Sequence, residues 1–425
     1  MKRGFLLRAQ EKKQKKISST NAVKKGSGPD ISEQDRKVPP NAIITPLSFG
    51  VVAEAEKTLP EDYKQFYSEP KYQEMHQDTV DFDHLMFTTI PQPEDGDGYS
   101  EWLVQDGKTK AKVVRAPGYP ARIPKPRLVN MAIVKEVPDM GFGLFTSCDI
   151  MRGELIFAER PLLVSPRGFP TLDVPGYTQE QQRQLSMLQF EAHLKIALGR
   201  MSASKQKAFM ALANNHTEDG SGPILGIIRT NGYMIDLGDD DDPDSVFNHY
   251  SAMGELASRI NHSCQPNIKQ EFDCASFSLQ FYANRDLKAG EQLFYSYCYI
   301  NTGVAERRAE LAPHGVVCKC SSCVNATPAS DKLRLTYIQE SSKLHQLALA
   351  NWKQGQKTDP KVFAAMLKLE RDMINEGLHG EDPFYTLLVT IAGSYKFAGR
   401  PTMGDNYLKR CPAKVQGHLI HSLCL

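Results

Sequence analysis

Alternation of apolar and polar positions predicts β-strands in two separate stretches of the chain. In the first stretch, strand-like residues occur at 131–134 and again at 155–157. In the second, residues 268–273 precede residues 276–283, where every second side chain is large and apolar, at Phe277, Leu279 and Phe281. That period of two is typical of a half-buried hairpin. We expect the chemistry of the protein to lie among these strands.

Helical patterns fill the stretch between the two groups of strands. Thr178 and Gln181 form a capping-box sequence, which marks the start of a helix. The helix that follows carries an apolar stripe at Leu185, Leu188, Ala192 and Ile196. A shorter helix holds Phe209 and Leu212.

Only helices are predicted after Cys323. Asp359-Pro360 and Asp382-Pro383 each place an N-cap before a proline at the first helical position. Gly377 and Gly399 stand where helices should end. Two or three antiparallel helix pairs are expected.

One short sequence occurs twice, as DIMRGELIF at residues 149–157 and as DLKAGEQLF at residues 286–294. Each copy predicts a turn that leads into a buried strand, with Gly153 or Gly290 supplying an unusual backbone angle. A turn type used twice and a duplicated segment fit this repeat equally well.

The length of 425 residues predicts two to four domains. No apolar run approaches the roughly 20 residues that a membrane helix needs. With 51 Lys and Arg against 50 Asp and Glu, the chain as a whole offers no basic field for nucleic acid. Nine cysteines are too few for a disulfide scaffold, and the apolar run at residues 5–7 is too short for a signal peptide. We therefore expect free thiols in a reducing compartment.

Positive charge is concentrated at the start of the chain. Residues 1–28 hold nine Lys or Arg against Glu11 alone, and residues 1–38 are predicted to be a disordered basic tail. The sequence KKQKK at residues 12–16 could be a nuclear import signal or a merely solvated segment, so nucleus and cytoplasm both fit. Residues 39–128 form an N-terminal extension of unclear structure.

Three cysteines, Cys318, Cys320 and Cys323, lie within one short loop. Structural zinc sites use four tetrahedral thiolate or imidazole ligands, and this spacing lets one loop supply three of them. Spacing alone leaves the fourth ligand open among Cys264, Cys298, Cys274 and His314. The alternative is a group of three buried free thiols.

A second polar cluster occupies residues 259–267, with the sequence RINHSCQPN between apolar segments. This cluster could be a turn with ordinary caps, or it could present His262 as a general base. Taken alone, the pattern favours the turn.

Together these motifs resemble the SET-domain protein lysine methyltransferases. The sequence MGFGLF at residues 140–145 resembles the opening Gly-x-Gly segment of that family, and the Asp-Ile-x-x-Gly-Glu and Glu-Arg-Pro sequences follow it in the right order. Asn261 to Asn267 match the family's Asn-His-Ser-Cys-x-Pro-Asn signature, and residues 290–297 resemble its Gly-Glu-Glu-hydrophobic-x-x-Tyr segment. The cysteine loop resembles the post-SET zinc loop.

The resemblance implies an α+β fold. Residues 129–325 would form a SET domain of short β-sheets, with a helical insert at about residues 170–257 and a zinc loop at residues 318–323. Residues 326–425 would form an all-helical domain that resembles tetratricopeptide-like repeats. The arrangement resembles the SET-and-MYND branch, and residues 214–237 resemble fungal members. The MYND finger itself is missing, because only Cys320 and Cys323 have Cys-x-x-Cys spacing.

The resemblance also implies an activity, the methylation of a protein lysine with S-adenosylmethionine. Tyr297 would be the catalytic tyrosine, and Cys264 would join the three loop cysteines as the fourth ligand of a structural Zn²⁺ ion. Gly141 and Gly143 would let the backbone approach the cofactor, and Asn261 and His262 would hold its amino-acid and adenine parts. The implied cofactor-binding set is Gly141, Gly143, Leu144, Asn261, His262 and Tyr297.

The implied partner is a protein substrate, histone or other, with an exposed lysine that could lie in a basic tail. The acidic residues 239–244 could attract such a tail, or could simply be solvated. We expect a monomer with no membrane association and no direct binding of nucleic acid. A catalytically silent SET-fold module that binds partners through the helical tail is the main alternative, and a nucleic-acid adaptor that uses the basic tail is a more distant one.

The sequence departs from the family pattern at two places. Gln292 replaces the second of two paired glutamates, a neutral change that should keep the turn. Val316 and Val317 stand where members of the branch often carry an aromatic residue that packs on the cofactor. Without the family resemblance, Tyr297 would be read as a core tyrosine.

Overall fold

The computed structural model describes residues 42–46, 86–93, 95–104, 107–172, 175–237 and 248–411. Their packing divides the chain into two compact units. The described part of the first unit comprises residues 42–122, 160–258 and 273–278 with the gaps just given, and that of the second comprises residues 123–159, 259–272 and 279–411. The predicted basic tail and the acidic residues 239–244 lie outside the described residues.

The first unit is built on a five-stranded sheet. Its strands, in spatial order, are β2 (Met86–Ile90), β3 (Ser100–Val104), β7 (Leu163–Pro166), β10 (His249–Met253) and β9 (Tyr233–Asp236). The strands β3 and β7 run parallel, and the other neighbours run antiparallel. A separate antiparallel pair joins β1 (Ala42–Pro46) to β8 (Gly168–Leu172).

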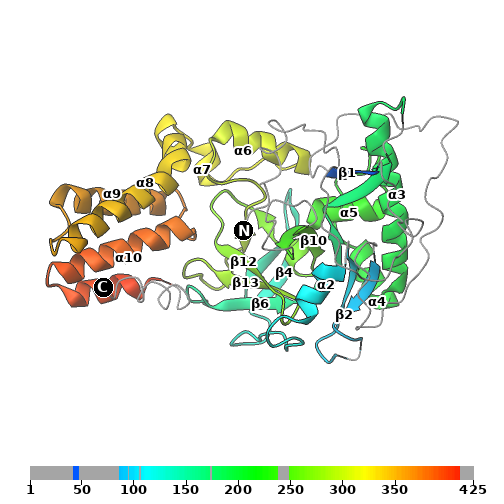
Figure 1. Ribbon diagram of the computed structural model, residues 1–425, viewed down its shortest axis with the longest axis horizontal. Helices are drawn as coiled ribbons and strands as arrows, with labels where there is room; N and C mark the ends of the chain where they lie inside the picture. The colour runs from blue at the N-terminus through cyan, green and yellow to red at the C-terminus, as the bar shows by residue number, and fades with distance from the viewer. Residues whose placement is uncertain are drawn as a thin grey trace, which may run out of the picture. The chain divides into compact units, whose positions relative to one another are not determined.

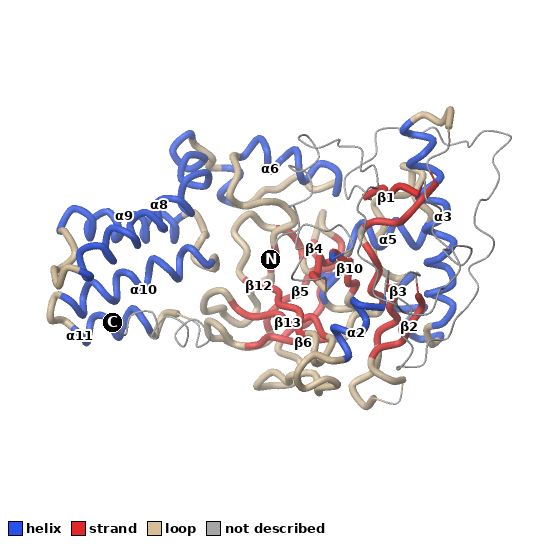
Figure 2. Tube along the Cα trace, viewed as in Figure 1, coloured by secondary structure: helices blue, strands red, loops and turns tan. Residues whose placement is uncertain are grey.

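Three helices cover one face of this sheet, as Figure 2 shows for α3 and α5. These helices are α3 (Gln179–Arg200), α4 (Ala203–Met210) and α5 (Pro223–Asn231). Phe87, Leu103, Leu163 and Met253 project from successive strands into a shared apolar core with Phe190 and Leu194 of α3 and with other residues of the three helices. On the sheet, Trp102 packs against Tyr250 and Phe277, at ring centroid distances of 5.9 and 5.2 Å.

The helix predicted to start at Thr178 is present, but its buried face is broader than the predicted stripe, and the strands β9 and β10 also lie within residues 170–257. Thr178 caps α3, and both hydrogen bonds of the capping box with Gln181 are present. Leu185 is fully buried, whereas Leu188, which we predicted on the same apolar stripe, is 45% exposed. Sheet and neighbouring helices instead bury polar positions of α3 such as Gln182 and Gln189, so a single apolar stripe does not mark the packed face.

Besides β1, two strands and a helix lie in the described part of the extension whose structure the sequence pattern did not reveal. They are β2, β3 and α2 (Gly107–Val114). The strand β3 is buried along its whole length between two sheet neighbours, and it carries Ser100 and Glu101 among apolar residues. A short strand with buried polar positions lacks a clean period of two, which explains why the pattern missed it.

The second unit holds three small sheets and the C-terminal helices. An antiparallel hairpin joins β4 (Ala132–Val137) to β5 (Gly141–Thr146). A three-stranded sheet has the order β12 (Ile268–Asp273), β13 (Ser278–Ala283) and β6 (Leu155–Glu159). A parallel pair joins β11 (Asn261–His262) to β14 (Phe294–Tyr295). The four stretches predicted as strands thus form strands, but the last begins at Ser278, because Phe277 lies in the preceding turn with a φ of 49°.

In the hairpin predicted to be half-buried, residues 278–281 of β13 are buried on both faces, whereas residues 269–273 of β12 are half-buried. Phe281 is fully buried and stacks on Phe157 at 4.7 Å. The intervening polar residues Ser278 and Gln280 are buried as well. Gln280 accepts a hydrogen bond of 2.6 Å from the Tyr282 hydroxyl, and Ser278 pairs with Ser276 at 2.7 Å. Because these polar groups have partners along the strand, their burial does not leave hydrogen bonds unmade.

The repeated sequence forms two turns that pair with each other. Ile150 and Leu287, at equivalent positions, exchange backbone hydrogen bonds of 3.0 and 2.8 Å. The aspartate of each copy caps the other copy: Asp149 accepts from the Ala289 amide at 2.9 Å, and Asp286 accepts from the Arg152 amide at 2.8 Å. Gly153 and Gly290 have φ angles of 76° and 83°, as their role in the turn predicts. The two copies therefore form a locally symmetric clasp.

Two helix pairs make up the described part of the C-terminal region, drawn in yellow to red in Figure 1. They are α8 (Pro328–Lys353) with α9 (Pro360–Asn375), and α10 (Asp382–Phe397) with α11 (Pro401–Leu408). Met366, Met373, Leu387, Leu388 and Ile391 are among the buried residues of their shared core. None of the helices that the structure describes has both the length and the apolar character to cross a membrane.

Most of the predicted helix ends in this region are confirmed. Asp359 caps α9 by accepting hydrogen bonds from two backbone amides, and Gly377 and Gly399 follow helix ends with φ angles of 70° and 77°. The N-cap of α10 is wrong by one residue, because Glu381 holds that position and Asp382 is the first helical residue. The acidic side chain of Asp382 still lies in the first turn, where it complements the helix dipole.

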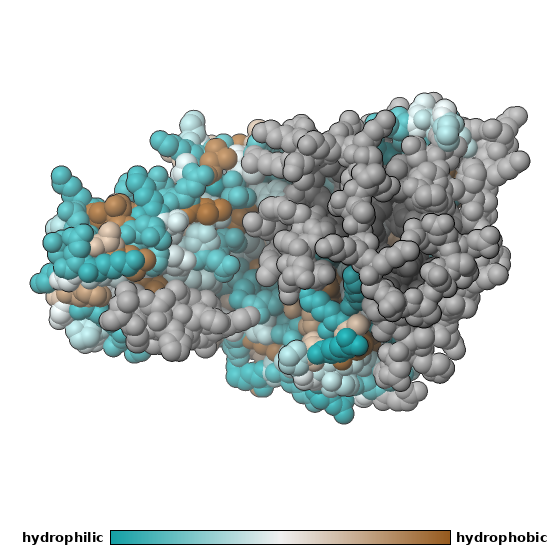
Figure 3. Space-filling model, viewed as in Figure 1, coloured by the Kyte–Doolittle hydropathy of each residue, from teal (hydrophilic) through white to brown (hydrophobic). Residues whose placement is uncertain are grey.

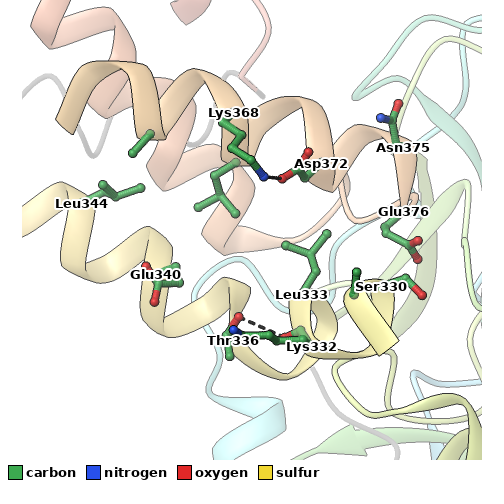
Figure 4. Close-up of a pocket in the computed structure, with 13 residues that line it drawn as sticks. Ser330, Lys332, Leu333, Thr336, Glu340, Leu344, Lys368, Asp372, Asn375 and Glu376 are labelled. Carbon is green, nitrogen blue, oxygen red and sulfur yellow. Dashed lines mark hydrogen bonds and ion pairs between the residues drawn. The ribbon is translucent and has the colours of Figure 1, made fainter. Parts of the chain in front are cut away.

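A groove of about 640 Å³ runs between α8 and α9 (Figure 4). Leu333 and Leu344 line it together with charged residues, among them Glu376 and the ion pair of Lys368 with Asp372 at 2.5 Å. On the face shown in Figure 3, apolar side chains of the helical region stand in separate patches among hydrophilic ones. The large apolar residues that are exposed on the helices α8 to α11 are Leu335, Ile338, Leu347, Ile374, Phe397 and Met403.

Candidate functional site

The parallel pair of β11 and β14 brings two of the sequence motifs together. Asn261 lies opposite Phe294, and His262 lies opposite Tyr295. The Asn267 side chain stabilises this pairing. Its oxygen accepts a hydrogen bond from the Phe294 amide at 2.7 Å, and its nitrogen donates to the Gln292 carbonyl at 2.8 Å. The sequence analysis assigned no role to Asn267, although its place as the last residue of the Asn-His-Ser-Cys-x-Pro-Asn signature could have indicated one.

Tyr297 points back toward the Asn261 segment. Its hydroxyl donates to the carbonyl oxygen of Ile260 at 2.5 Å, and its backbone amide donates to Nδ1 of His262 at 2.9 Å. Its half-buried ring packs against the rings of His262 and His314, at centroid distances of 5.4 and 6.1 Å. The tyrosine is thus held at three points, although it lies 35 residues from His262 in the sequence.

Both ring nitrogens of His262 have partners inside the protein. Because Nδ1 accepts the Tyr297 amide, the proton of the neutral ring lies on Nε2. Nε2 is 3.4 Å from Sγ of Cys264 and can donate to it. The ring is 7% exposed. This arrangement suits a residue that positions Tyr297 and Cys264, and it argues against a general base.

The Gly-x-Gly segment lies beside Asn261. The Asn261 side chain donates to the Phe142 carbonyl at 3.1 Å, and the Arg259 guanidinium lies 5.3 Å from the centre of the Phe142 ring. The side chain of Leu144 is fully buried, and its carbonyl accepts from the Leu293 amide at 2.7 Å. Any contact of Leu144 with a ligand would therefore involve its backbone.

The two glycines of this segment are needed for different reasons. Gly141 has a φ of 71°, and a Cβ atom there would meet no atom within 4 Å. At Gly143 a Cβ atom would lie 2.6 Å from the Gln292 side chain and 2.7 Å from that of Val137. Gly141 thus leaves open space beside the backbone, and Gly143 allows the strand to pack against its neighbours.

We expect Gly143→Ala to destabilise the protein more than Gly141→Ala. The first substitution overpacks β5 against Val137 and should cost about 1 to 3 kcal/mol, whereas the second strains one backbone angle and should cost about 1 kcal/mol. Urea unfolding of the two variants measures the difference. Equal or reversed losses would contradict this assignment of the two glycines.

Four cysteines converge beside Tyr297. The Sγ atoms of Cys264, Cys318, Cys320 and Cys323 all lie within 4.8 Å of one another. Cys264, 54 residues before Cys318, is fully buried, and its Sγ is 3.4 Å from Cys323 and 3.9 Å from Cys318. The hydrogen bond from Cys264 lowers the pKa of Cys320 and also lowers that of Cys323, to about 6.

The sulfur positions fit a tetrahedral metal site. Four thiolates at about 2.3 Å from a zinc ion lie about 3.8 Å from one another, and the observed separations bracket that value. Of the four candidates for the last position, only Cys264 joins the three loop cysteines among the described residues. Cys298 groups with His262 and Cys264, and His314 packs on Tyr297. Burial and the neighbouring charge of Asp273 raise the pKa of the Cys274 thiol.

A buried arginine connects the cysteine cluster to the helical region. Arg334 of α8 has no exposed surface and donates to the carbonyl of Ile300 at 2.8 Å and to the Ser322 hydroxyl at 2.6 Å. It also forms an ion pair with Glu376 at 3.0 Å, and its Nη1 is 3.4 Å from the Cys264 carbonyl. No sequence signal distinguished Arg334 from a solvated helix residue.

Replacing Arg334 by Leu should lower the free energy of unfolding by about 3 kcal/mol, because the Glu376 carboxylate and the buried acceptors would lose their donor. Arg371→Leu is the matched control, since Arg371 is exposed on α9 and should change stability by less than about 0.5 kcal/mol. Denaturant unfolding measures both. Similar losses for the two variants would show that the Arg334 network does not stabilise the unit.

Comparison with known proteins identifies the class of domain. Residues 141–298 match the family model of the SET domain, so the chain contains a SET domain, as the motifs predicted. The predicted fold class is confirmed: short sheets and a helical insert form the SET region, and an all-helical region follows. The domain limits and the tetratricopeptide-like character of the helices stay predictions.

Three relatives show where the similarity lies. Histone-lysine N-methyltransferase set5 of Schizosaccharomyces pombe is 29% identical over 191 residues, which cover 45% of this chain and 49% of that relative. The SET domain and MYND-type zinc finger protein 6 of the same organism is 30% identical, over 32% of this chain and 33% of the relative. Putative SET domain-containing protein L678 of Acanthamoeba polyphaga mimivirus is 33% identical, over 23% of this chain and 35% of the relative. The chain thus spans about half the length of the first relative and about a third of the others.

Proposed function

We propose that this protein transfers a methyl group from S-adenosylmethionine to the side-chain nitrogen of a lysine in a protein substrate. The observation that carries the proposal is the position of Tyr297, which hydrogen bonds with Ile260 and His262 hold beside Asn261 and the Gly-x-Gly segment. The SET domain and the name of the yeast relative set5 support the same activity.

The open backbone at Gly141 supports a cofactor position at this segment. A Cβ atom at Gly141 would occupy space that a ligand could take, and the neighbouring Phe142 side chain is 47% exposed. Gly141, Gly143 and the backbone of Leu144 would line the cofactor, and Asn261 and His262 would orient it. S-adenosylmethionine, when bound, supplies a methyl group on a positively charged sulfur.

Tyr297 would align the lysine nitrogen. A tyrosine hydroxyl has one proton to donate, and Tyr297 gives it to the Ile260 carbonyl. Toward a substrate its oxygen can therefore act only as an acceptor, either of an N–H bond of the lysine amine or of weak C–H contacts. Alignment of this kind is the main source of rate, since well-oriented reactions reach effective molarities of roughly 10⁵ to 10⁸ M.

The lysine must be uncharged to react, yet its ordinary pKa is about 10.4. The half-buried surroundings of Tyr297 disfavour an ammonium ion and would lower the pKa of the inserted lysine. No strong base is needed for this step. That agrees with the engagement of both His262 nitrogens inside the protein.

We propose a structural Zn²⁺ at Cys264, Cys318, Cys320 and Cys323. Four cysteine ligands leave no open coordination position, which is typical of structural sites. The ion would tie the 318–323 loop to the segment that carries Asn261 and His262. Because Val316 packs on this cluster and Val317 is 84% exposed, the loop would also present an apolar side chain beside it.

The substrate we propose is a protein with an exposed lysine, and histones are the first to test because of the name of the relative set5. That name also favours a nuclear place of action, with the cytoplasm as the alternative. We expect the protein to act as a monomer.

The activity is tested by incubating the full chain with methyl-labelled S-adenosylmethionine, first with core histones and then with a mixed protein extract. Labelled lysine, identified by mass spectrometry, is the expected result. Binding of the cofactor by calorimetry without any labelled protein would contradict the proposal and favour a catalytically silent SET-fold module.

A further inference from the structure

A fifth sulfur lies beside the four-cysteine cluster. The Sγ atoms of Cys298 and Cys264 and a ring nitrogen of His262 lie within 4.8 Å of one another. Cys298 is half-buried and packs against the cluster, but it does not belong to the group of four sulfurs that are all within that distance. Metal binding by the four cysteines therefore leaves Cys298 without a role.

Cys264 has sulfur neighbours of two kinds. Cys323 at 3.4 Å and Cys318 at 3.9 Å belong to the metal-binding group, and Cys298 belongs to neither the loop nor that group. A sulfur that enters a disulfide is no longer a thiolate ligand. Cys264 can thus either coordinate the metal or form a disulfide with Cys298, but not both.

We propose that Cys298 is a peroxide-sensitive thiol that forms a disulfide with Cys264 and so releases the metal ion. The inference rests on the proposed structural zinc site. Disulfides that form reversibly in a reducing compartment are typical of redox sensing.

The reaction needs a peroxide as the oxidant. The Cys298 thiolate, its proton lost to solvent, attacks one peroxide oxygen, the O–O bond breaks, and the departing hydroxide is protonated to water. The Cys264 thiolate then attacks the sulfur of the resulting sulfenic acid, the S–S bond forms, and the sulfenic oxygen leaves as a second water. Two thiols and one hydrogen peroxide thus give one disulfide and two waters, and three cysteine ligands remain for the metal.

The proposed disulfide would act directly on the candidate site. Cys298 follows Tyr297 in the chain, and Cys264 follows His262 by two residues. The Tyr297 amide and the His262 ring already meet at 2.9 Å, so a bond between the flanking cysteines would link the two segments covalently beside that hydrogen bond. Loss of the metal would at the same time free the 318–323 loop.

The test uses the full chain, purified reduced and with its zinc content measured. After hydrogen peroxide is added, a chromogenic chelator follows zinc release, and peptide mapping without reductant locates disulfides. We expect release of zinc together with a peptide pair that joins Cys264 to Cys298 and has lost two hydrogens. Cys298→Ser should release zinc at least about tenfold more slowly, because attack on the buried Cys264 would lack its partner. Cys148→Ser, which changes a half-buried cysteine outside the cluster, should behave as the parent protein.

Several results would overturn the proposal. Equal zinc release from Cys298→Ser and the parent would show that Cys298 is not the sensitive thiol. A disulfide among Cys318, Cys320 and Cys323 in place of the Cys264–Cys298 pair would do the same. Reduced protein that holds no zinc would overturn the structural metal site as well. Methyl transfer is tested by a separate assay, so its failure can be distinguished from a failure of this proposal.

Discussion

Replacing Tyr297 by Phe should lower kcat/KM for methyl transfer by roughly 10² to 10³. The substitution removes one oxygen that the Ile260 carbonyl and the His262 ring hold in a fixed position. A preorganised polar group of this kind contributes about 3 to 4 kcal/mol to transition-state stabilisation when it acts on the reacting atoms. The fold should change little, because the lost hydrogen bond to Ile260 is worth about 1 kcal/mol.

Three measurements separate a catalytic tyrosine from a structural one. Thermal unfolding should show a small loss of stability, calorimetry should show unchanged cofactor affinity, and the loss should fall on the transfer step. Tyr282→Phe is the matched control, since Tyr282 also donates its hydroxyl within the protein, to Gln280 at 2.6 Å, but lies outside the site. Activity of Tyr297→Phe within a factor of three of the parent would remove Tyr297 from the mechanism.

The resemblance of the motifs to the SET family was enough to predict which segments meet. Asn261, Tyr297 and the Gly-x-Gly segment lie up to 156 residues apart, from Gly141 to Tyr297, and two hydrogen bonds and one strand pair join them in the structure. Local signals such as the Thr178 capping box and the glycines after α9 and α10 were also confirmed, because short-range geometry alone decides them.

Features that depend on contacts between distant residues could not be predicted in the same way. Spacing left four candidates for the fourth ligand, and only the folded chain shows that Cys264 lies within 4.8 Å of the three loop cysteines. The burial of Arg334 depends on acceptors at Ile300, Ser322 and Glu376, none of which is near it on the helix surface. The burial of the polar face of β13 was missed for a different reason, because its partners Ser276 and Tyr282 are only two residues away and a period of two carries no signal for such hydrogen bonds.

Removing the metal should destabilise the second unit by about 5 kcal/mol. A zinc ion at the four cysteines would cross-link the Cys264 segment to a loop that begins 54 residues later, and free energy of metal binding to a site that exists only in the folded state adds to folding stability. The cluster also contacts the first and last residues of the helix α6 (Val304–Leu311), so a loosened loop would expose apolar surface. We expect thorough chelation to lower Tm by about 10 °C or more.

Cys320→Ala should reproduce the effect of chelation, because it removes one ligand and leaves three. Cys274→Ala is the control, since Cys274 belongs to neither sulfur group, and it should keep both the zinc content and most of the stability. Added Zn²⁺ should restore the melting temperature of the chelated parent, and Mg²⁺ should not, because thiolate ligands select soft or borderline metal ions over hard ones. Unfolding curves that coincide before and after chelation, with metal loss confirmed by elemental analysis, would show that the ion does not hold the loop in place.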